Sequence, residues 1–319
     1  MTEQNEPAHK EISMNNGRSI PALGFGTLIP DLADTLRATK SALQAGFRQF
    51  DCSERYRNEQ AVGEAIQAVL QEGKVRRDDL FIATKLWNNN HRPERVKPAF
   101  EASLARLRLD YVDLYLMHTP FAFRPGDDQD PQDENGKTLY DDGVTLSETW
   151  AAMERLVDEG KCRAIGLSDV DLAQVTEINR SARIRPAVVH VEAHPYLPQW
   201  ELLEACKQGG MVFQAFAVLG HSFEPRLLED EVIKKIAAAV GKTAAQVCIA
   251  WALQRGTAIL TTSTNPDHIR ESLDVSPLPE GAMEAIKGIT TRYRFNKVVE
   301  TGLPGFIPRE ADRKRAAAE

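Results

Sequence analysis

The chain has 319 residues, of which 42% are hydrophobic, and its formal net charge is −7 at pH 7. This length and composition suit one large domain with a sizeable core. Acidic and basic residues are interspersed, without the basic stripe that binds nucleic acid or an anionic membrane surface. No segment has the length of an apolar transmembrane span, and the polar N-terminus lacks the apolar core of a signal peptide. These features predict a cytoplasmic protein with neither a nucleic-acid nor a membrane partner.

The four cysteines are widely separated and none forms a CxxC pair. This spacing argues against a structural zinc site and against a disulfide framework. No other cluster of His, Cys and carboxylate residues has ligand spacing, so we expect no metal site. Cys52 is interpreted as a small buried side chain, with an oxidation-sensitive thiol as the alternative.

The chain begins with polar residues 1–9, which are expected to form a disordered leader. Two short extended stretches between Ile12 and Ile20 then flank Asn16-Gly17, a typical hairpin turn. The next stretch, Leu23–Thr27, is the first expected barrel strand, and its glycines would let a cofactor approach the backbone closely.

From there strand and helix patterns alternate, which is typical of parallel βα units. The further strand candidates are FRQFD, LFIATK, VDLYLMH, CRAIGLS, AVVHVE, MVFQAF and AILTTS. Helical patterns cover residues 32–45, 58–72, 93–108, 145–159, 170–180, 199–208, 228–239 and 266–273, with additional patterns at 243–254 and 279–288. The alternation predicts a (β/α)₈ TIM barrel forming a single domain over residues 10–308, followed by a frayed charged tail at 309–319.

Four reactive side chains stand where apolar strands give way to loops. Asp51 ends one strand candidate and Tyr56 follows it, while Lys85 and His118 end the next two candidates. The carboxyl ends of barrel strands are where active sites are assembled. Each residue also has an ordinary structural explanation. Asp51 and Lys85 could form a salt bridge within the barrel. His118 could be a hydrogen-bonded histidine at a strand end, and Tyr56 an aromatic residue of a loop.

These residues and the runs DLFIATKLW and YVDLYLMHTP around them resemble the aldo-keto reductases, whose catalytic tetrad is an Asp, a Tyr, a Lys and a His. The resemblance extends from about Ile12 to Pro308. It implies a barrel closed at the bottom by an N-terminal β-hairpin, with two extra helices outside the repeat. Residues 243–254 and 279–288 are interpreted as these two helices.

Such a tetrad has the chemistry for reducing a carbonyl group by hydride transfer. Negative charge builds on the carbonyl oxygen, which needs a proton donor near neutral pH. Tyr56 is expected to donate this proton, with the cation of Lys85 lowering its pKa. Asp51 would be the counterion of Lys85, and His118 would bind and orient the carbonyl. A nicotinamide nucleotide supplies the hydride.

The resemblance also implies the nucleotide contacts, some of which depart from the family pattern. Asp169 replaces an Asn and His190 replaces a Gln, both of which hold the nicotinamide carboxamide in the family. Phe216 replaces a stacking tyrosine but keeps its ring. The expected contacts are Gly26, Thr27, Ser168, Asp169, His190, Phe216, Leu219, His221, Thr262, Ser263, His268 and Glu271.

The largest departure is at the adenosine end. Thr262 and His268 stand where NADPH-preferring relatives carry a Lys and an Arg that hold the 2′-phosphate. Arg270 and the backbone amides of the helix that begins near Pro266 remain as possible phosphate contacts. We expect NADPH from the habit of the family, with NADH as the alternative.

The substrate pocket is defined less clearly. Leu28 and Thr119 replace tryptophans that line it in many relatives, whereas Trp87 is retained. Fewer aromatic walls suggest a wide mouth for a bulky ketone or diketone as well as an aldehyde. The polar segment Phe121–Gly143, too long for an ordinary connection, is expected to border the pocket and to be functional or mobile. The final segment RYRFNKVVETGLPGFIP is expected to form a second wall.

The sequence as a whole predicts a monomeric NAD(P)H-dependent reductase of aldehydes or ketones. Two alternatives remain open. One is an NAD-linked alcohol or sugar dehydrogenase that works in the oxidative direction, which the altered adenosine end favours. The other is a nucleotide-binding sensor with little turnover, which the changes at Asp169 and His190 permit and the intact tetrad opposes.

Overall fold

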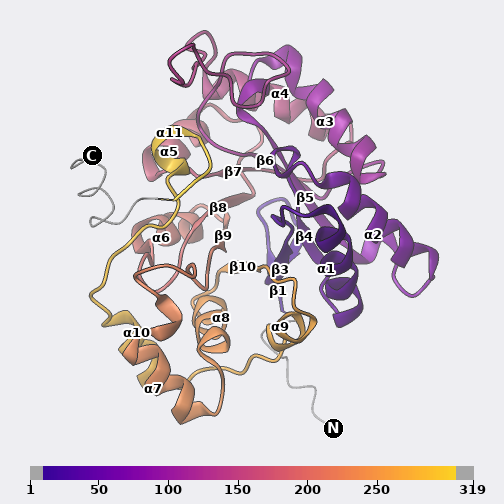
Figure 1. Ribbon diagram of the computed structural model, residues 1–319. Helices are drawn as coiled ribbons and strands as arrows, with labels where there is room; N and C mark the ends of the chain where they lie inside the picture. The colour runs from indigo at the N-terminus through magenta and orange to yellow at the C-terminus, as the bar shows by residue number, and fades with distance from the viewer. Residues whose placement is uncertain (1–9, 307–319) are drawn as a thin grey trace.

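The computed structural model describes residues 10–306, so the leader at 1–9 and the tail at 309–319 lie outside the described residues. Eight parallel strands close into a barrel in the order β10-β3-β4-β5-β6-β7-β8-β9, and helices surround it (Figure 1). The predicted (β/α)₈ barrel is therefore confirmed. Its strands are β3 Leu23–Gly26, β4 Gln49–Asp51, β5 Phe81–Leu86, β6 Leu114–Met117, β7 Ile165–Ser168, β8 Val188–Glu192, β9 Val212–Phe216 and β10 Ala258–Thr261.

The helices follow the predicted ranges to within a few residues. They are α1 Leu32–Ala45, α2 Glu59–Gln71, α3 Pro93–Leu107, α4 Leu146–Asp158, α5 Leu172–Ser181, α6 Trp200–Gln208, α7 Glu231–Val240, α8 Ala244–Gln254, α9 Pro266–Glu271, α10 Glu280–Lys287 and the short α11 Val298–Thr301.

Local sequence explains these elements. Every residue of β5 is buried, as expected for a parallel strand covered on both faces. Helix α4 begins at a capping box in which Thr145 and Glu148 each bond the other's backbone N–H. Helix α1 ends at Gly46, whose φ of 117° is a conformation that favours glycine.

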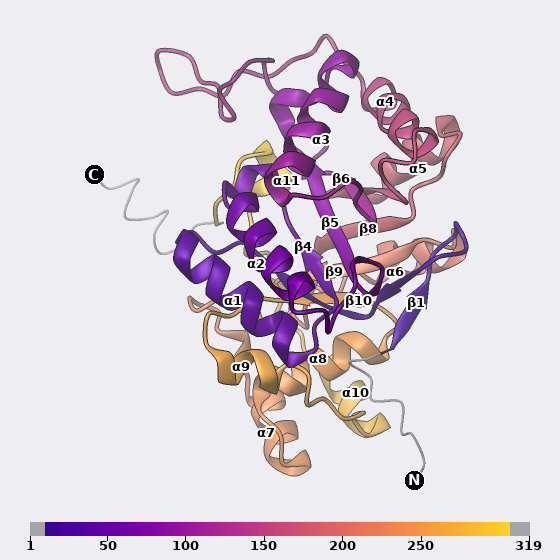
Figure 2. The same cartoon turned by 90° about the vertical axis from the view of Figure 1, so that its right-hand side faces the viewer.

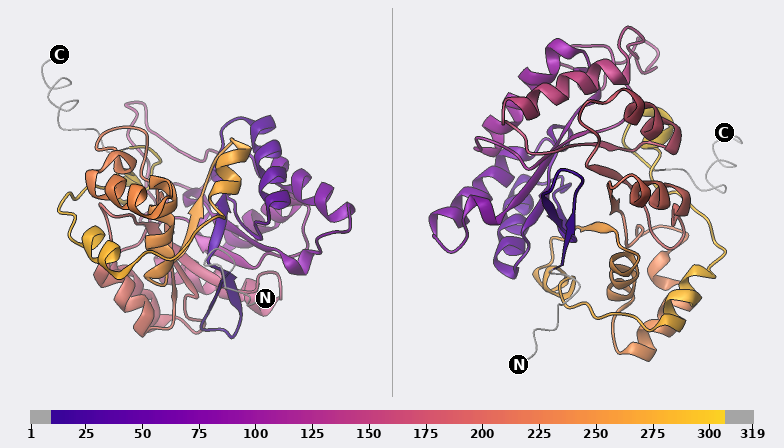
Figure 3. Two further views of the ribbon diagram at one scale, coloured as in Figure 1. Left: turned by 90° about the horizontal axis from the view of Figure 1, so that it is seen from below. Right: turned by 180° about the vertical axis from the view of Figure 1, so that it is seen from behind.

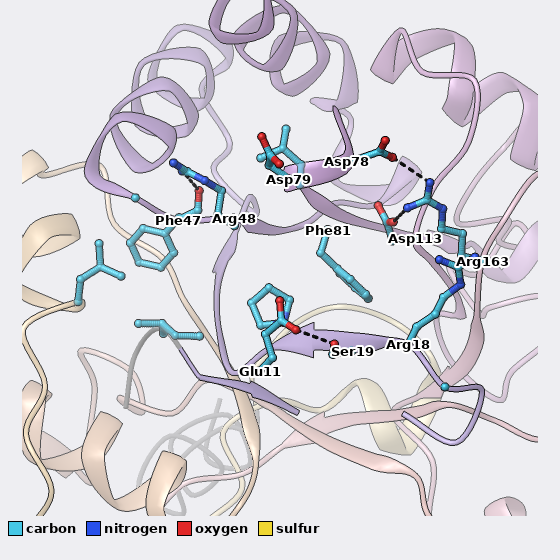
Figure 4. A pocket seen from close by; sticks show the side chains of 16 residues that line it. Glu11, Arg18, Ser19, Phe47, Arg48, Asp78, Asp79, Phe81, Asp113 and Arg163 are labelled. Carbon is cyan, nitrogen blue, oxygen red and sulfur yellow. Dashed lines mark hydrogen bonds and ion pairs between the residues drawn. The ribbon is translucent and has the colours of Figure 1, made fainter. Parts of the chain in front are cut away.

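The N-terminal hairpin pairs β1 (Glu11–Ser13) with β2 (Ser19–Pro21) around Gly17, and Figure 3 shows it lying across one end of the barrel. The side-chain amides of Asn15 and Asn16 donate to the carbonyls of Pro186 and Arg163, which fastens the hairpin to the barrel. A polar cavity of about 450 Å³ lies between hairpin and barrel (Figure 4). It is at the amino ends of the strands, so it is separate from the predicted site at their carboxyl ends.

The assignment of residues 243–254 as an extra helix was wrong. Helix α8 packs against the barrel strand β10, whereas the main neighbours of α7 are α8, α10 and the turn η5 (Leu227–Glu229). In Figure 1, α7 and α10 accordingly lie outside the ring. The apolar residues of α8 surround the whole helix, which is typical of a helix covered on several sides. Within residues 10–306 no single helix is long and apolar enough to cross a membrane; α7 and α8 meet those criteria only as a pair, bent by 92°.

The long segment 121–143 contains no helix or strand and extends away from the barrel beside α3 (Figure 2). Isolated bridges join Phe123 to Tyr140 and Gln132 to Thr138, so the segment folds back on itself. Its Asp130 binds Arg55 through both carboxylate oxygens, at 3.1 Å to Nε and 2.5 Å to Nη2. These bonds fix the segment against the rim of the barrel.

Candidate active site

The four predicted catalytic side chains converge at the carboxyl ends of the strands. Asp51 is the last residue of β4, Lys85 belongs to β5, His118 follows β6, and Tyr56 lies in the 3₁₀ turn η2 (Glu54–Tyr56) after β4. Lys85 Nζ lies 2.6 Å from Asp51 Oδ2 and 2.9 Å from the Tyr56 hydroxyl oxygen. The rings of Tyr56 and His118 meet edge to face, with centroids 5.8 Å apart. The structure therefore brings the whole tetrad together.

Lys85 is a buried ammonium group held by oxygen atoms on several sides. Its side chain has no exposed surface, and Nζ also donates to the carbonyl of Cys52 at 2.9 Å. Burial lowers the pKa of Lys85, but the negative charge of Asp51 and the hydrogen bonds to Asp51 and Tyr56 outweigh this, so the pKa lies above its ordinary value. The charged form of Lys85 is thus retained without solvent.

The Tyr56 hydroxyl keeps its proton in this environment. Burial raises its pKa above the ordinary value, Lys85 lowers it, and Asp51 raises it again. The expected lowering of the pKa by Lys85 is therefore present, but desolvation of the phenolate outweighs it, so the pKa lies above its ordinary value. A neutral phenol next to an ammonium group can act as a proton donor.

His118 is a neutral imidazole between aromatic rings. Burial, followed by the positive charge of Lys85, holds its pKa well below the ordinary value. The indole of Trp87 contacts it edge to face at 4.9 Å, and its Nδ1 lies 3.0 Å from the hydroxyl oxygen of Ser53. Neighbouring Cys52 is completely buried, and burial raises the pKa of its thiol, which favours the small buried side chain over the oxidation-sensitive alternative.

Two buried polar atoms, one just after β7 and one on β8, have no partner among the described residues. Ser168 of β7 stands opposite His190 of β8 in register, and the Ser168 hydroxyl oxygen is 3.4 Å from His190 Nδ1. Among the described residues, Asp169 Oδ1 and His190 Nε2 have no hydrogen-bond partner although both atoms are buried. Buried polar groups are nearly always paired, so these atoms fit a ligand with both donors and acceptors, such as a carboxamide.

Asp169 has the electrostatics of a neutral carboxylic acid. Burial is the main cause that raises its pKa to about 8, Glu192 contributes in the same direction, and Arg294 and Lys85 oppose it. Its backbone adopts φ of 52°, a left-handed conformation that Asp and Asn tolerate better than most residues. The aromatic ring of Phe216 contacts His190 at 5.1 Å, so the predicted nicotinamide contacts form one cluster.

The two glycines of β3 leave room for neighbouring barrel side chains. A Cβ atom on Gly26 would lie 2.6 Å from the Thr262 hydroxyl oxygen, and one on Gly24 would collide with Gln49. These positions therefore need glycine for the packing of the barrel, and the approach of a cofactor to the backbone of Gly26 stays a prediction. Thr27 is also engaged, since its hydroxyl donates to the carbonyl of Asp51 at 2.9 Å.

At the adenosine end, most predicted contacts already have partners within the protein. The Thr262 hydroxyl donates to the carbonyl of Gly26 at 3.0 Å, and Arg270 is paired with Asp267. Glu271 accepts a hydrogen bond from the Thr243 hydroxyl. His268 is exposed at the start of α9. The Ser263 hydroxyl accepts from the backbone of Asn265 at 3.1 Å.

The loop after β9 is held by aromatic contacts. The imidazole of His221 stacks on Phe223, with ring planes at 3° and centroids 5.4 Å apart, and contacts Phe306 at 4.6 Å. Leu219, two residues earlier, is half-buried. These contacts connect the loop that carries the predicted nucleotide contacts Leu219 and His221 to the C-terminal part of the described chain.

The model of the Aldo/keto reductase family matches residues 22–291. The chain belongs to this family. It is 41% identical to aldo-keto reductase family 1 member C1 of Macaca fuscata fuscata, over 90% of this chain and 93% of the relative. It is 40% identical to prostaglandin F synthase 1 of Bos taurus, over 91% and 94% of the two chains. The solved structure of the aldose reductase from Schistosoma japonicum superimposes with a TM-score of 0.87 at 37% identity, covering 94% of this chain and 99% of that one.

Family membership identifies an oxidoreductase that acts on aldehydes or ketones with a nicotinamide cofactor. In this aldo/keto reductase the predicted substrate-pocket residues differ in exposure. Leu28 is 60% exposed, whereas Trp87 and Thr119 are completely buried. The Trp87 indole N–H donates to the carbonyl of Gln129 at 2.7 Å, and the Thr119 hydroxyl donates to Asn88 Oδ1 at 2.7 Å. Only Leu28 of the three therefore presents a free surface.

Sequence reasoning missed two residues that organise the reductase site. Ser53 bonds His118, and its position before a polar helical turn was the available signal. Glu192 accepts hydrogen bonds from the backbone N–H groups of Phe295 and Asn296, at 2.7 and 2.9 Å, and from His194 at 3.0 Å. An acid at the end of the apolar strand VVHVE was the signal for this second residue. Its bonds attach the C-terminal segment to the barrel.

Proposed function

We propose that this aldo/keto reductase reduces aldehydes or ketones with Tyr56 as the proton donor. The observation that carries the proposal is the position of Lys85 Nζ, within hydrogen-bond distance of both Asp51 and the Tyr56 hydroxyl. The bound nicotinamide nucleotide supplies the hydride. The protein residues supply the proton and hold the carbonyl.

The protonated state of Tyr56 suits this role. The hydroxyl holds its proton at neutral pH and releases it only when the carbonyl oxygen gains negative charge. As the proton leaves, the phenolic oxygen becomes anionic and its hydrogen bond from Lys85 strengthens. Asp51 keeps Lys85 charged throughout, and the neutral imidazole of His118 orients the carbonyl oxygen.

The nucleotide is proposed to be NADPH, with NADH as the alternative. Asp169 and His190 support a carboxamide site because each offers a buried atom without a protein partner. Ser168 and Phe216 lie beside them, and Leu219 and His221 belong to the loop proposed for the pyrophosphate. Gly26, Thr27, Thr262, Ser263, His268 and Glu271 remain proposed contacts, although several already have partners within the protein.

The single measurement that tests the function is the initial rate of NADPH and NADH oxidation with carbonyl substrates from methylglyoxal to bulky diketones. A reductase oxidises at least one nucleotide with at least one carbonyl. Preference for NADH together with faster oxidation of alcohols would favour a dehydrogenase. Nucleotide binding without turnover would favour a sensor and contradict the proposal.

The same panel tests the proposed wide substrate mouth. Exposed Leu28 and the buried positions of Trp87 and Thr119 support an entrance with few aromatic walls. Compact and bulky carbonyls should therefore have comparable kcat/KM. Rejection of every bulky substrate would contradict this. We further propose that the protein is cytoplasmic and monomeric, and gel filtration of the purified protein tests the monomeric state.

A further inference from the structure

Ser53 lies between the tetrad histidine and the turn that carries Tyr56. Its side chain is completely buried and forms the N-cap of η2. The hydroxyl oxygen accepts a hydrogen bond from the backbone N–H of Arg55 at 3.1 Å and lies 3.0 Å from His118 Nδ1. One hydroxyl group therefore contacts both the backbone of the turn and the imidazole.

The direction of the bond to His118 follows from the single hydrogen of the hydroxyl. Ser53 acts as an acceptor toward Arg55, so its own hydrogen is available for one donation. Among the described residues, the remaining hydrogen-bond partner of this hydroxyl is His118 Nδ1. An unpaired polar hydrogen is costly on a completely buried hydroxyl such as that of Ser53, so donation to Nδ1 is the favoured arrangement. Nδ1 then carries no hydrogen.

The imidazole has one N–H because it is neutral, and an acceptor at Nδ1 places this hydrogen on Nε2. The opposite tautomer would present an Nε2 lone pair to the site. A substrate carbonyl oxygen also carries lone pairs, so that tautomer would repel the group that His118 is proposed to orient. It would also leave the hydrogen of Ser53 without an acceptor.

We infer that Ser53 is a positioning residue that fixes His118 as the Nε2–H tautomer, so that the imidazole presents a donor to the carbonyl oxygen beside the Tyr56 hydroxyl. The inference rests on the proposed function, because it requires a carbonyl bound beside Tyr56. The same hydroxyl bonds the backbone next to Tyr56, so it also sets the relative position of the two donors. The edge-to-face contact of the two rings, at 82°, agrees with one fixed orientation of the imidazole.

A role limited to capping η2 is the competing explanation. Both explanations predict some loss of stability when the hydroxyl is removed, so stability alone does not separate them. The tautomer of His118 does separate them, because a simple cap has no effect on it. Ser53→Ala removes the hydroxyl, and Ser53→Thr retains it. Ser103→Ala is the matched control, since Ser103 is also completely buried but lies on α3 and accepts a bond from Arg106.

The tautomer is measured directly by long-range ¹H–¹⁵N NMR of protein labelled at histidine ring nitrogens, with His118 assigned by its loss in His118→Gln. In the wild type we expect an unprotonated Nδ1 and a protonated Nε2. Ser53→Ala should show a mixture of tautomers, and Ser103→Ala should keep the wild-type spectrum. A protonated Nδ1 in the wild type overturns the inference, whether or not the Ser53 variants fold.

Kinetics give the second readout. We expect Ser53→Ala to lower kcat/KM about tenfold, as for the loss of one hydrogen bond in the transition state. The effect should be mainly on kcat and should be largely restored in Ser53→Thr. Wild-type kcat/KM in Ser53→Ala overturns the inference. Absence of carbonyl reduction by the wild-type enzyme would instead contradict the proposed function, while the histidine spectrum would still test the tautomer.

Discussion

Lys85 Nζ lies 2.6 Å from Asp51 Oδ2, and neither side chain has more than 3% of its surface exposed. Their opposite charges face each other where solvent screens little. Removing one partner of such a pair leaves an uncompensated charge in the core, whereas removing both does not. This asymmetry leads to the first prediction.

Lys85→Met should lower the free energy of unfolding by roughly 3–5 kcal/mol, and Asp51→Asn/Lys85→Met should recover part of that loss. Urea unfolding of the single and double variants measures the coupling. Asp79→Asn is the control, because Asp79 pairs with Arg76 at the surface and the change should be small. Losses that simply add in the double variant would contradict a coupled buried pair.

Tyr56→Phe should abolish turnover and leave nucleotide affinity nearly intact. The hydroxyl is the proposed proton donor, and a positioned general acid contributes about a hundredfold to ten-thousandfold to the rate. Single-turnover hydride transfer measures the rate, and fluorescence titration measures the affinity. Tyr111→Phe is a suitable control, because Tyr111 lies between the guanidinium groups of Arg77 and Arg163, away from the tetrad. Retained turnover in Tyr56→Phe would exclude Tyr56 as the donor.

Asp169 should make the stability of the protein depend on pH. Its folded-state pKa of about 8 is above the ordinary aspartate value, so between about 4 and 8 the folded state holds one more proton than the unfolded state. The contribution of Asp169 to the free energy of unfolding is therefore greatest at low pH. It falls as the pH rises, by up to about 1.4 kcal/mol per pH unit. Asp169→Asn should therefore gain stability over the wild type as pH increases from 5 to 8.

Unfolding curves of both proteins at several pH values measure this difference. Asp171→Asn is the control, because Asp171 is an exposed N-cap of α5 and asparagine caps equally well. A constant difference between Asp169→Asn and the wild type would contradict a neutral buried carboxyl. Glu192, Arg294 and Lys85 act on the same group but remain present in the variant, so the comparison isolates Asp169.

The ionisation of Asp169 should also change which form of the nucleotide binds better. If the neutral acid donates to the carboxamide, ionisation removes this donor and introduces a negative charge that attracts the cationic oxidised ring. The ratio of the Kd of the oxidised nucleotide to that of the reduced nucleotide should fall between pH 6.5 and 9. The same ratio should be constant in Asp169→Asn. A falling ratio in both proteins would assign the effect to another group.

His268→Arg should increase the preference for NADPH over NADH by about tenfold, because an arginine at the start of α9 can bind a phosphate through two hydrogen bonds. Asp267→Asn tests whether Arg270 can serve instead, since Asp267 holds it in the wild type. Ratios of kcat/KM for the two nucleotides measure both effects. No change in either variant would place the 2′-phosphate away from α9.

The sequence by itself determined the barrel and the position of the tetrad. Asp51, Lys85 and His118 each end an apolar run, and parallel strands in a barrel place all carboxyl ends at one rim. The turn Asn16-Gly17 likewise determined the hairpin, because its backbone geometry favours glycine. These features depend on residues close together in the chain, which is why periodicity and turn chemistry revealed them.

Only the tertiary structure decided the features that depend on burial and on distant partners. Burial by the surrounding fold raises the pKa of the half-buried Tyr56, an effect that a motif does not encode. Ser53 and His118 are 65 positions apart and become partners only when β4 and β6 lie in one barrel. Helix α8 differs from α7 in which neighbours cover it. Solvent exclusion and long-range pairing are properties of the packed chain, so local sequence patterns leave them open.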